Sequence, residues 1–252
     1  MSRVLVLIIV VIGVVLNVYP QESSFYDAPL GGGIGYTPGW VMPKVDGINT
    51  QLRNINFPNI PSSGFYSSGV SGFLYLGILK NFRIGGFGFG GSKSNSGIYT
   101  VDPLGSSSIA PQLEQRQTDY SLTGGGVSFE YTLPFVKDVA VSVGTLLGRG
   151  SLNISIYRNN GGAEWQSVWQ GVYSSPVSSF SMKNSYWLFS PILNIEIPAY
   201  RMLCFRIGAG YQFTFGGNWT YDNDKDVSNV PSNINGNSFF IQTGIFIGLF
   251  SF

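Results

Sequence analysis

The chain has no histidine and only one cysteine among its 252 residues. Without histidine, it can build neither a histidine-based catalytic triad nor a histidine metal site. A single cysteine can form no disulfide within the chain and no zinc site of the Cys-x-x-Cys type. These two absences exclude several common classes of enzyme and metal centre before any motif is considered.

Charged residues are also scarce, at 11% of the chain, whereas soluble domains usually carry about 25%. Mean hydropathy is +0.16, yet beyond the N-terminus no apolar run reaches the roughly 18 residues that indicate a membrane-spanning helix. Basic and acidic residues nearly balance, at 14 and 13, and no basic patch indicates a nucleic-acid partner. Together with 34 glycines and 15% aromatic residues, this composition favours an all-β chain whose strands face lipid.

The N-terminus has the pattern of an export signal. Arg3 precedes an apolar stretch, Val4–Leu16, that only Gly13 interrupts. A secretory signal peptide has this order of segments, and a membrane anchor would need about 20 apolar residues. We predict a cleaved signal peptide over residues 1–20, with the cleavage site left open and an uncleaved anchor as the alternative. Residues 21–252 then form a single domain.

Alternating apolar residues dominate that domain. In Leu203–Phe215 every odd position is apolar, and the even positions are small or polar. This pattern indicates a strand with one apolar face, long enough for the roughly 9–11 residues of a transmembrane barrel strand. The alternation changes phase at Gly85–Gly86 and at Gly148–Gly150, and the second change suggests a β-bulge. Similar alternating segments are Val70–Ile78, Val127–Leu133, Val139–Thr145 and Leu193–Ile197, and Ser238–Phe252 is apolar on both faces.

The connections between these segments alternate in length. Short connections are predicted at Lys80–Asn81, Pro134–Asp138 and Pro198–Arg201, and long ones at Ser92–Gln117, Arg158–Lys183 and Gly217–Gly236. Outer-membrane barrels join their strands by short periplasmic turns and long external loops. With a first strand near Leu30–Pro38, the sequence predicts an antiparallel up-and-down transmembrane β-barrel of about eight strands. Ten strands are the alternative, if Leu152–Arg158 and Glu164–Tyr173 form an external ribbon.

One segment has helical spacing instead. Val45, Ile48, Leu52 and Ile55 recur at intervals of three and four residues. Pro43 suits a first helical turn, and the next proline, at position 58, ends the helix. We predict a short helix near residues 43–57, in the first external loop, which packs on the barrel rim or dips into the barrel mouth.

These features resemble small bacterial outer-membrane β-barrel proteins. The resemblance rests on the signal-like Met1–Pro20, the alternating strands and the ending Ile245–Phe252. Such families end in an aromatic residue, with apolar residues at alternate positions before it, and the barrel-assembly machinery reads that end. The resemblance therefore implies an assembly signal at Phe252, Phe250 and Phe246, with Gly248 interrupting the series. It also implies an outer-membrane location, with the assembly machinery and outer-membrane lipids, including lipopolysaccharide, as partners.

Four charged residues near the short turns form the first candidate site. Glu130, Glu196 and Arg206 lie on strand faces opposite the apolar stripes, which point into the lumen of a narrow barrel. Arg83 lies near the same barrel end. Because an unpaired buried charge is costly, we expect these residues to pair as a charge network that plugs the lumen. An ion or proton path is the alternative, and catalysis a more distant one.

An acidic run is the second candidate. Asp222, Asp224 and Asp226 have the spacing with which a calcium loop begins. Val227 stands where such a loop needs glycine, and Asn233 where it needs glutamate. We therefore expect a solvated external loop, with a weak divalent-cation site as the alternative.

The tryptophans are the third candidate group. All five fall near predicted strand ends or in external loops, where aromatic girdles form at the membrane interface. Trp165 and Trp169 could instead stack on sugars or other ligands. The group consists of Trp40, Trp165, Trp169, Trp187 and Trp219.

We expect a non-enzymatic outer-membrane barrel without a cofactor, whose long loops carry a structural, surface-binding or adhesion role toward an unknown external ligand. A narrow channel or transporter for small solutes is the alternative. The missing histidines disfavour a lipid-modifying barrel enzyme. The long apolar strand faces disfavour a secreted barrel that binds lipid inside.

Overall fold

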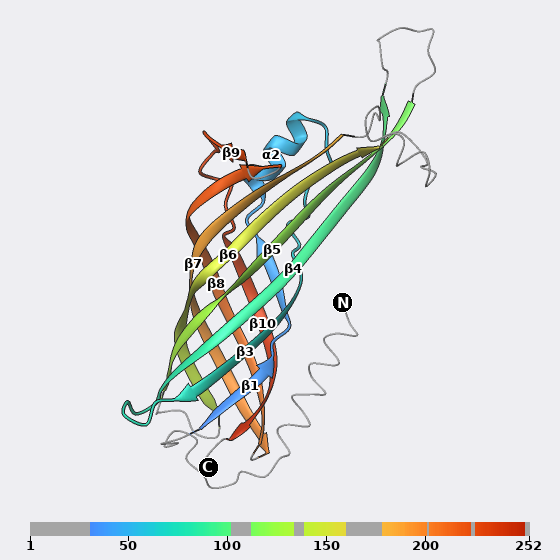
Figure 1. Cartoon of the computed structure of the whole chain (residues 1–252). Coiled ribbons are helices and arrows are strands. Elements are labelled where there is room, and N and C mark those ends of the chain that lie inside the picture. Colours follow the sequence, from blue (N-terminus) through green and yellow to red (C-terminus); the bar gives the residue numbers. More distant parts are fainter. Residues whose placement is uncertain are drawn as a thin grey trace, which may run out of the picture.

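A computed structural model describes residues 31–101, 112–133, 139–159, 178–200, 202–222 and 225–249. Within these ranges the chain forms one antiparallel sheet and one helix, and the sheet curls into a tall barrel (Figure 1). The elements are β1 (Gly32–Tyr36), β2 (Gly39–Pro43), α2 (Asp46–Asn54), β3 (Phe65–Tyr75), β4 (Phe82–Val101), β5 (Gln112–Thr132), β6 (Ala140–Asn159), β7 (Ser178–Tyr200), β8 (Leu203–Tyr221), β9 (Lys225–Val227) and β10 (Ser238–Leu249). In this described part of the chain, no helix is both long and apolar enough to cross a membrane.

The sheet closes into a ring of eight strand positions, which confirms the predicted fold class. From β3 to β8 each strand pairs with its sequence neighbour, and β10 then pairs with β8. β1 and β2 share the remaining position between β10 and β3, interrupted at Thr37 and Pro38. β9 pairs with β8 alone, outside the ring. β6 runs unbroken to Asn159, so its last residues do not start a separate ribbon; Glu164–Tyr173 lies outside the described residues.

Up-and-down connectivity sorts the connections to two ends of the barrel (Figure 1). The β3–β4, β5–β6 and β7–β8 connections are short and share one end, which we call the short-turn end. The helix α2, β9, the last residues of β4 and β6 and the first residues of β5 and β7 lie at the opposite end, the loop end. The three short turns therefore share one side, as the sequence predicts.

Five neighbouring strands are longer than the sequence indicates. β4 to β8 contain 19 to 23 residues each, whereas β3 has 11 and β10 has 12. Large parts of the predicted loops Ser92–Gln117, Arg158–Lys183 and Gly217–Gly236 are therefore strand. These extensions are rich in serine, asparagine and glycine, and few apolar residues alternate in them, so the signal by which strands are recognised from sequence is weak there. One side of the barrel projects well beyond the other as a result.

The two predicted phase changes are not irregularities of the sheet. The pairing of β4 with β5 and of β6 with both neighbours runs in register through Gly85–Gly86 and Gly148–Gly150, so the predicted bulge is wrong. The apolar residues change face because the lumen itself changes from polar to apolar along the barrel. A true register shift occurs opposite Tyr186 and Trp187. There Gly216 adopts a φ of +55°, a conformation that glycine reaches without strain.

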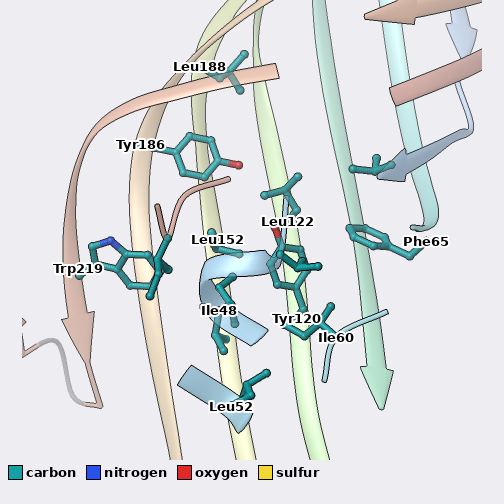
Figure 2. Packing of buried hydrophobic residues seen from close by; sticks show 14 of the residues in the cluster. Ile48, Leu52, Ile60, Phe65, Tyr120, Leu122, Leu152, Tyr186, Leu188 and Trp219 are labelled. Atoms are coloured by element: carbon teal, nitrogen blue, oxygen red, sulfur yellow. The ribbon is translucent and has the colours of Figure 1, made fainter. Parts of the chain in front are cut away.

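The helix α2 closes the lumen at the loop end. Val45, Ile48 and Leu52 are buried in one cluster with inward-facing residues of β5 to β8, and Figure 2 shows Ile48 and Leu52 among those side chains. The side-chain amide of Asn49 donates to the carbonyl of Ile60 at 2.9 Å and accepts its N–H at 2.8 Å, which fixes the loop that follows. The helix therefore caps the barrel mouth.

Two details of the predicted helix are wrong. Pro43 ends β2, where it pairs with Ser238 of β10, and does not begin the helix. Ile55 is 46% exposed because it follows the last helical turn. The next residue, Asn56, has a positive φ of 54°, which asparagine tolerates better than most residues, and it turns the chain away.

Leu52 and Ile55 provide a matched test of the helical cap. Truncating buried Leu52 to alanine should cost about 2–5 kcal/mol of unfolding free energy, because it leaves a cavity in the apolar cluster. The exposed Ile55→Ala change should cost far less. Denaturant unfolding of the folded barrel in detergent measures both, and equal effects would contradict the packing described here.

Candidate functional site

Four strands bring four charged side chains into the lumen near the short-turn end. Arg83 on β4 is directly opposite Glu130 on β5, and Glu196 on β7 is directly opposite Arg206 on β8. All four are buried, with Arg83 only 1% exposed. The structure thus brings the four predicted residues into one group, called here the ionic cluster.

Arg83 is the centre of the ionic cluster. Its Nε and Nη2 donate to Glu130 Oε2 at 3.1 and 2.5 Å. Its Nη1 and Nη2 donate to the two carboxylate oxygens of Glu196 at 2.8 and 2.7 Å, and Nη2 also donates to Ser142 Oγ at 2.7 Å. One planar guanidinium therefore holds both carboxylates, as its fixed fork of donors allows.

Arg206 completes the charge balance. Its Nη2 lies 2.5 Å from Glu196 Oε1, and its Nη1 lies 3.5 Å from Glu130 Oε1. Two neutral side chains, Ser142 and Asn194, each donate to Glu130 Oε2 at 3.1 Å. Two positive charges therefore face two negative charges, and the two neutral groups donate further hydrogen bonds to the Glu130 carboxylate.

Aromatic rings pack on both guanidinium groups. Arg83 Cζ lies 4.4 Å from the centre of the Phe73 ring, and Arg206 Cζ lies 4.3 Å from that of Phe246. Such cation–π contacts are stabilising where the cation is shielded from water. Phe246, part of the predicted assembly signal, thus faces the lumen; Phe250 and Phe252 lie outside the described residues. The assembly role of all three stays a prediction.

A small cavity lies between the ionic cluster and the rest of the lumen, with both polar and apolar residues in its lining. Its volume is about 60 Å³, and its lining includes Glu130, Arg206, Gln212 and Gln242. The hydroxyl of Ser238, another lining residue, is buried and makes no hydrogen bond within the described part of the chain. A cavity of about 60 Å³ has room for a few water molecules, and the Ser238 hydroxyl offers one of them a hydrogen-bond partner.

Beyond the cavity the lumen is apolar. Gln212 marks the transition, since its amide donates to the carbonyl of Gly236 at 3.0 Å. Inward side chains of β5 to β8 then pack against α2 (Figure 2). This upper seal contains Tyr120, Leu122, Leu146, Leu152, Ile154, Ile156, Tyr186, Leu188, Ile192 and Trp219, together with Val45, Ile48 and Leu52.

The outer surface carries an apolar belt around the barrel. Large apolar side chains at the outward positions of the strands are exposed. Along β5, β6 and β7 these positions become polar toward the loop end, where Thr123, Ser151 and Ser185 follow. The belt includes Ile34, Val70, Leu74, Val127, Val143, Leu147, Phe189, Leu193, Ile195, Ile207, Phe213, Phe215, Phe239, Ile241, Ile245 and Ile247.

The tryptophans do not form a single group. Trp40 and Trp187 lie on the outer surface, where a girdle residue would lie. The prediction for Trp219 is wrong, because this side chain is buried in the upper seal. The irregularity at Gly216 reverses the alternation of β8 before Trp219. Trp165 and Trp169 lie outside the described residues.

The acidic run lies where β8 turns into β9. Asp222 Oδ1 accepts the backbone N–H of Ser181 at 2.8 Å, and Asp226 pairs with Thr220 in the ladder between β8 and β9. Asp224 lies outside the described residues. Among the residues described, no group of three metal-binding side chains gathers here or elsewhere.

Sequence reasoning missed the neutral partners of the ionic cluster and the aromatic rings that cover it. Ser142 and Asn194 lie on the inward phase of β6 and β7, as Glu196 does. The same alternation that places Glu196 could therefore have placed them. The outward stripe of Val70 and Leu74 likewise places Phe73 on the inward face, but alternation gives no sign that its ring packs on a guanidinium.

No protein-family model matches the chain, and no curated protein is similar to it in sequence. Solved structures of bacterial outer-membrane barrels resemble it. Ail, the attachment invasion locus protein of Yersinia pestis, is 11% identical with a TM-score of 0.41, over 87% of this chain and 99% of that one. Neisserial surface protein A is 9% identical with a TM-score of 0.44, over 88% and 97%. A major outer membrane protein of Thermus thermophilus is 7% identical with a TM-score of 0.45, over 86% and 99%.

Arg83 is the residue whose removal should disturb the ionic cluster most. Arg83→Leu leaves two carboxylates with one remaining arginine, and breaking a buried ion pair typically costs about 3–5 kcal/mol. Arg83→Leu combined with Glu196→Gln should recover part of that loss, because it removes the uncompensated charge. Thermal unfolding in detergent measures both variants. Lys225→Leu, at an exposed position of β9, is the control, and an Arg83→Leu barrel as stable as this control would contradict the assignment.

Proposed function

We propose that this protein is an integral barrel of the bacterial outer membrane, exported through the predicted signal peptide. The apolar belt carries the proposal. A closed ring satisfies its backbone hydrogen bonds between neighbouring strands, so it can present apolar side chains to lipid without an open sheet edge. A barrel that worked in water would instead expose its belt at a large cost.

Within that membrane the protein acts without catalysis, as a structural or surface-binding element. The two seals of the lumen support this role, because the ionic cluster fills one end and the upper seal fills the other. Barrels of eight strands have an interior that side chains can fill completely. The projecting strands β4 to β8 extend the loop end beyond the belt, which is where an external ligand would be met.

A narrow channel for small solutes is the second candidate. The cavity of about 60 Å³ between the two seals favours it, because the buried hydroxyls of Ser71 and Ser238 in its lining make no hydrogen bond within the described residues and are suited to water or a small polar solute. For transport, both the ionic cluster and the α2 cap would have to open. The sealed lumen makes this the less favoured role.

Fractionation tests the proposed location. The mature protein should sediment with membranes, resist extraction by high salt, and run on a detergent gel with a mobility that changes on heating. An unheated closed barrel keeps its compact shape in detergent, whereas the heated chain unfolds. Recovery of the protein in the soluble periplasmic fraction would contradict the membrane proposal.

Conductance in planar bilayers separates the two roles. The wild-type barrel should show no steady ion conductance, since both ends of its lumen are filled. Arg206→Leu should lower the unfolding temperature through loss of the contacts to Glu196 and Glu130, without creating a selective current. If the wild type conducts and Arg206→Leu changes ion selectivity at unchanged stability, the channel role replaces the structural one.

A further inference from the structure

A basic depression lies on the outer wall of the barrel. It has a volume of about 550 Å³ and is open to the outside. Its polar lining residues are Arg149, Thr123, Ser151 and Ser185, and Phe89 and two glycines complete the lining. The hydroxyls of Thr123 and Ser151 are hydrogen-bonded at 2.9 Å. A cation and three hydroxyls from three neighbouring strands therefore meet in one place.

The depression sits where the apolar belt ends. Arg149 on β6 is opposite Trp187 on β7, and its guanidinium lies 4.8 Å from that ring. The next outward pair toward the short-turn end is Leu147 and Phe189, which belongs to the belt. The next pair toward the loop end is polar. In the proposed membrane, Arg149 thus lies at the level of the lipid headgroups.

The positive charge of this depression is not neutralised by the described part of the chain. No carboxylate there forms an ion pair with Arg149. Asp119 on the same wall accepts the side-chain amide of Gln117 at 2.8 Å, and Asp222 is held by a backbone N–H. Lys183, exposed on β7 beyond Ser185, adds a second cation.

Space is left beside the guanidinium. The β5 residue opposite Arg149 is Gly125, and the β4 residue opposite Gly125 is Gly88. A Cβ atom at Gly88 would meet no atom of the chain closer than 3.9 Å. The wall next to Arg149 is therefore flat and open, so a bulky group can approach the guanidinium from this side.

We propose that this depression binds the anionic phosphate of a lipid headgroup, with the acyl chains of that lipid along the apolar belt. The inference rests on the proposed membrane location. A guanidinium can donate two parallel hydrogen bonds to a phosphate, and the hydroxyls supply further donors. Continuity of the depression with the belt favours a lipid over free phosphate, because the belt covers the apolar part of the same ligand.

The test uses the full-length mature barrel, folded in detergent and titrated with lipid A that carries its phosphates. Bound lipid is counted by native mass spectrometry. The wild type should bind this lipid about tenfold more tightly than the same lipid without phosphates, because the lipid without phosphates cannot accept the charge-assisted hydrogen bonds from Arg149. Arg149→Gln should abolish most of that difference, and Lys183→Gln should reduce it. Inorganic phosphate should not compete at millimolar concentration.

Two further variants test whether a loss of lipid binding reflects the depression itself and not a failure of the barrel to fold. Gly88→Leu adds a side chain to the open wall, where its Cβ atom would meet no atom of the chain closer than 3.9 Å, and should weaken lipid binding. Lys225→Gln, at an exposed position of β9, should leave binding unchanged. Equal affinity of wild type and Arg149→Gln for both lipids would overturn the inference, and so would full competition by inorganic phosphate. If the barrel folds but shows no preference for the phosphorylated lipid, only the lipid site is refuted. If the chain never shows a heat-dependent mobility on the gel, the proposed membrane location is refuted as well.

Discussion

Burial of four charges in a lumen too narrow to hydrate them is the constraint on which the short-turn end depends. Each charge alone would be very costly to bury, so the arginines and glutamates are tolerable only as a balanced set. Arg83 and Arg206 reach the two carboxylates from different strands. The cluster therefore ties β4, β5, β7 and β8 together across the lumen, in addition to the backbone ladders between neighbouring strands.

At the loop end, apolar side chains and not charged ones fill the lumen. There most inward side chains are apolar, and no strand can cover them, since the sheet has already closed. The helix α2 supplies the missing surface with Ile48 and Leu52. A small cavity separates the two regions, so the barrel has an ionic seal, a cavity and an apolar seal in series. This order favours a role outside the lumen, at the loop end or at the lipid-facing wall.

The outer wall divides along the same axis. An apolar belt covers the part near the short-turn end, and hydroxyl-rich strand extensions cover the part beyond it. Arg149 and Trp187 stand at the boundary between them. A single boundary on the wall therefore has two consequences: it sets the depth at which the barrel would sit in a bilayer, and it places an uncompensated cation at headgroup level.

Alternation of side chains determined the fold class and the inward faces of Glu130, Glu196 and Arg206. Together with the alternating lengths of the connections, it also indicated about eight strands and the side of the short turns. This was possible because a strand buried on one face and exposed to lipid on the other has a period of two residues. The helical spacing of Ile48 and Leu52 likewise identified a helix.

Only the tertiary structure decided the rest. Alternation shows which face of a strand a side chain occupies, but it does not show which side chains of other strands that residue contacts across the lumen. The central position of Arg83, the rings on the guanidinium groups and the cap formed by α2 depend on closure of the ring. The sequence misread Gly148–Gly150 as a bulge because the lumen changes from polar to apolar there, and it placed Trp219 outside because one glycine, Gly216, reverses the alternation of β8.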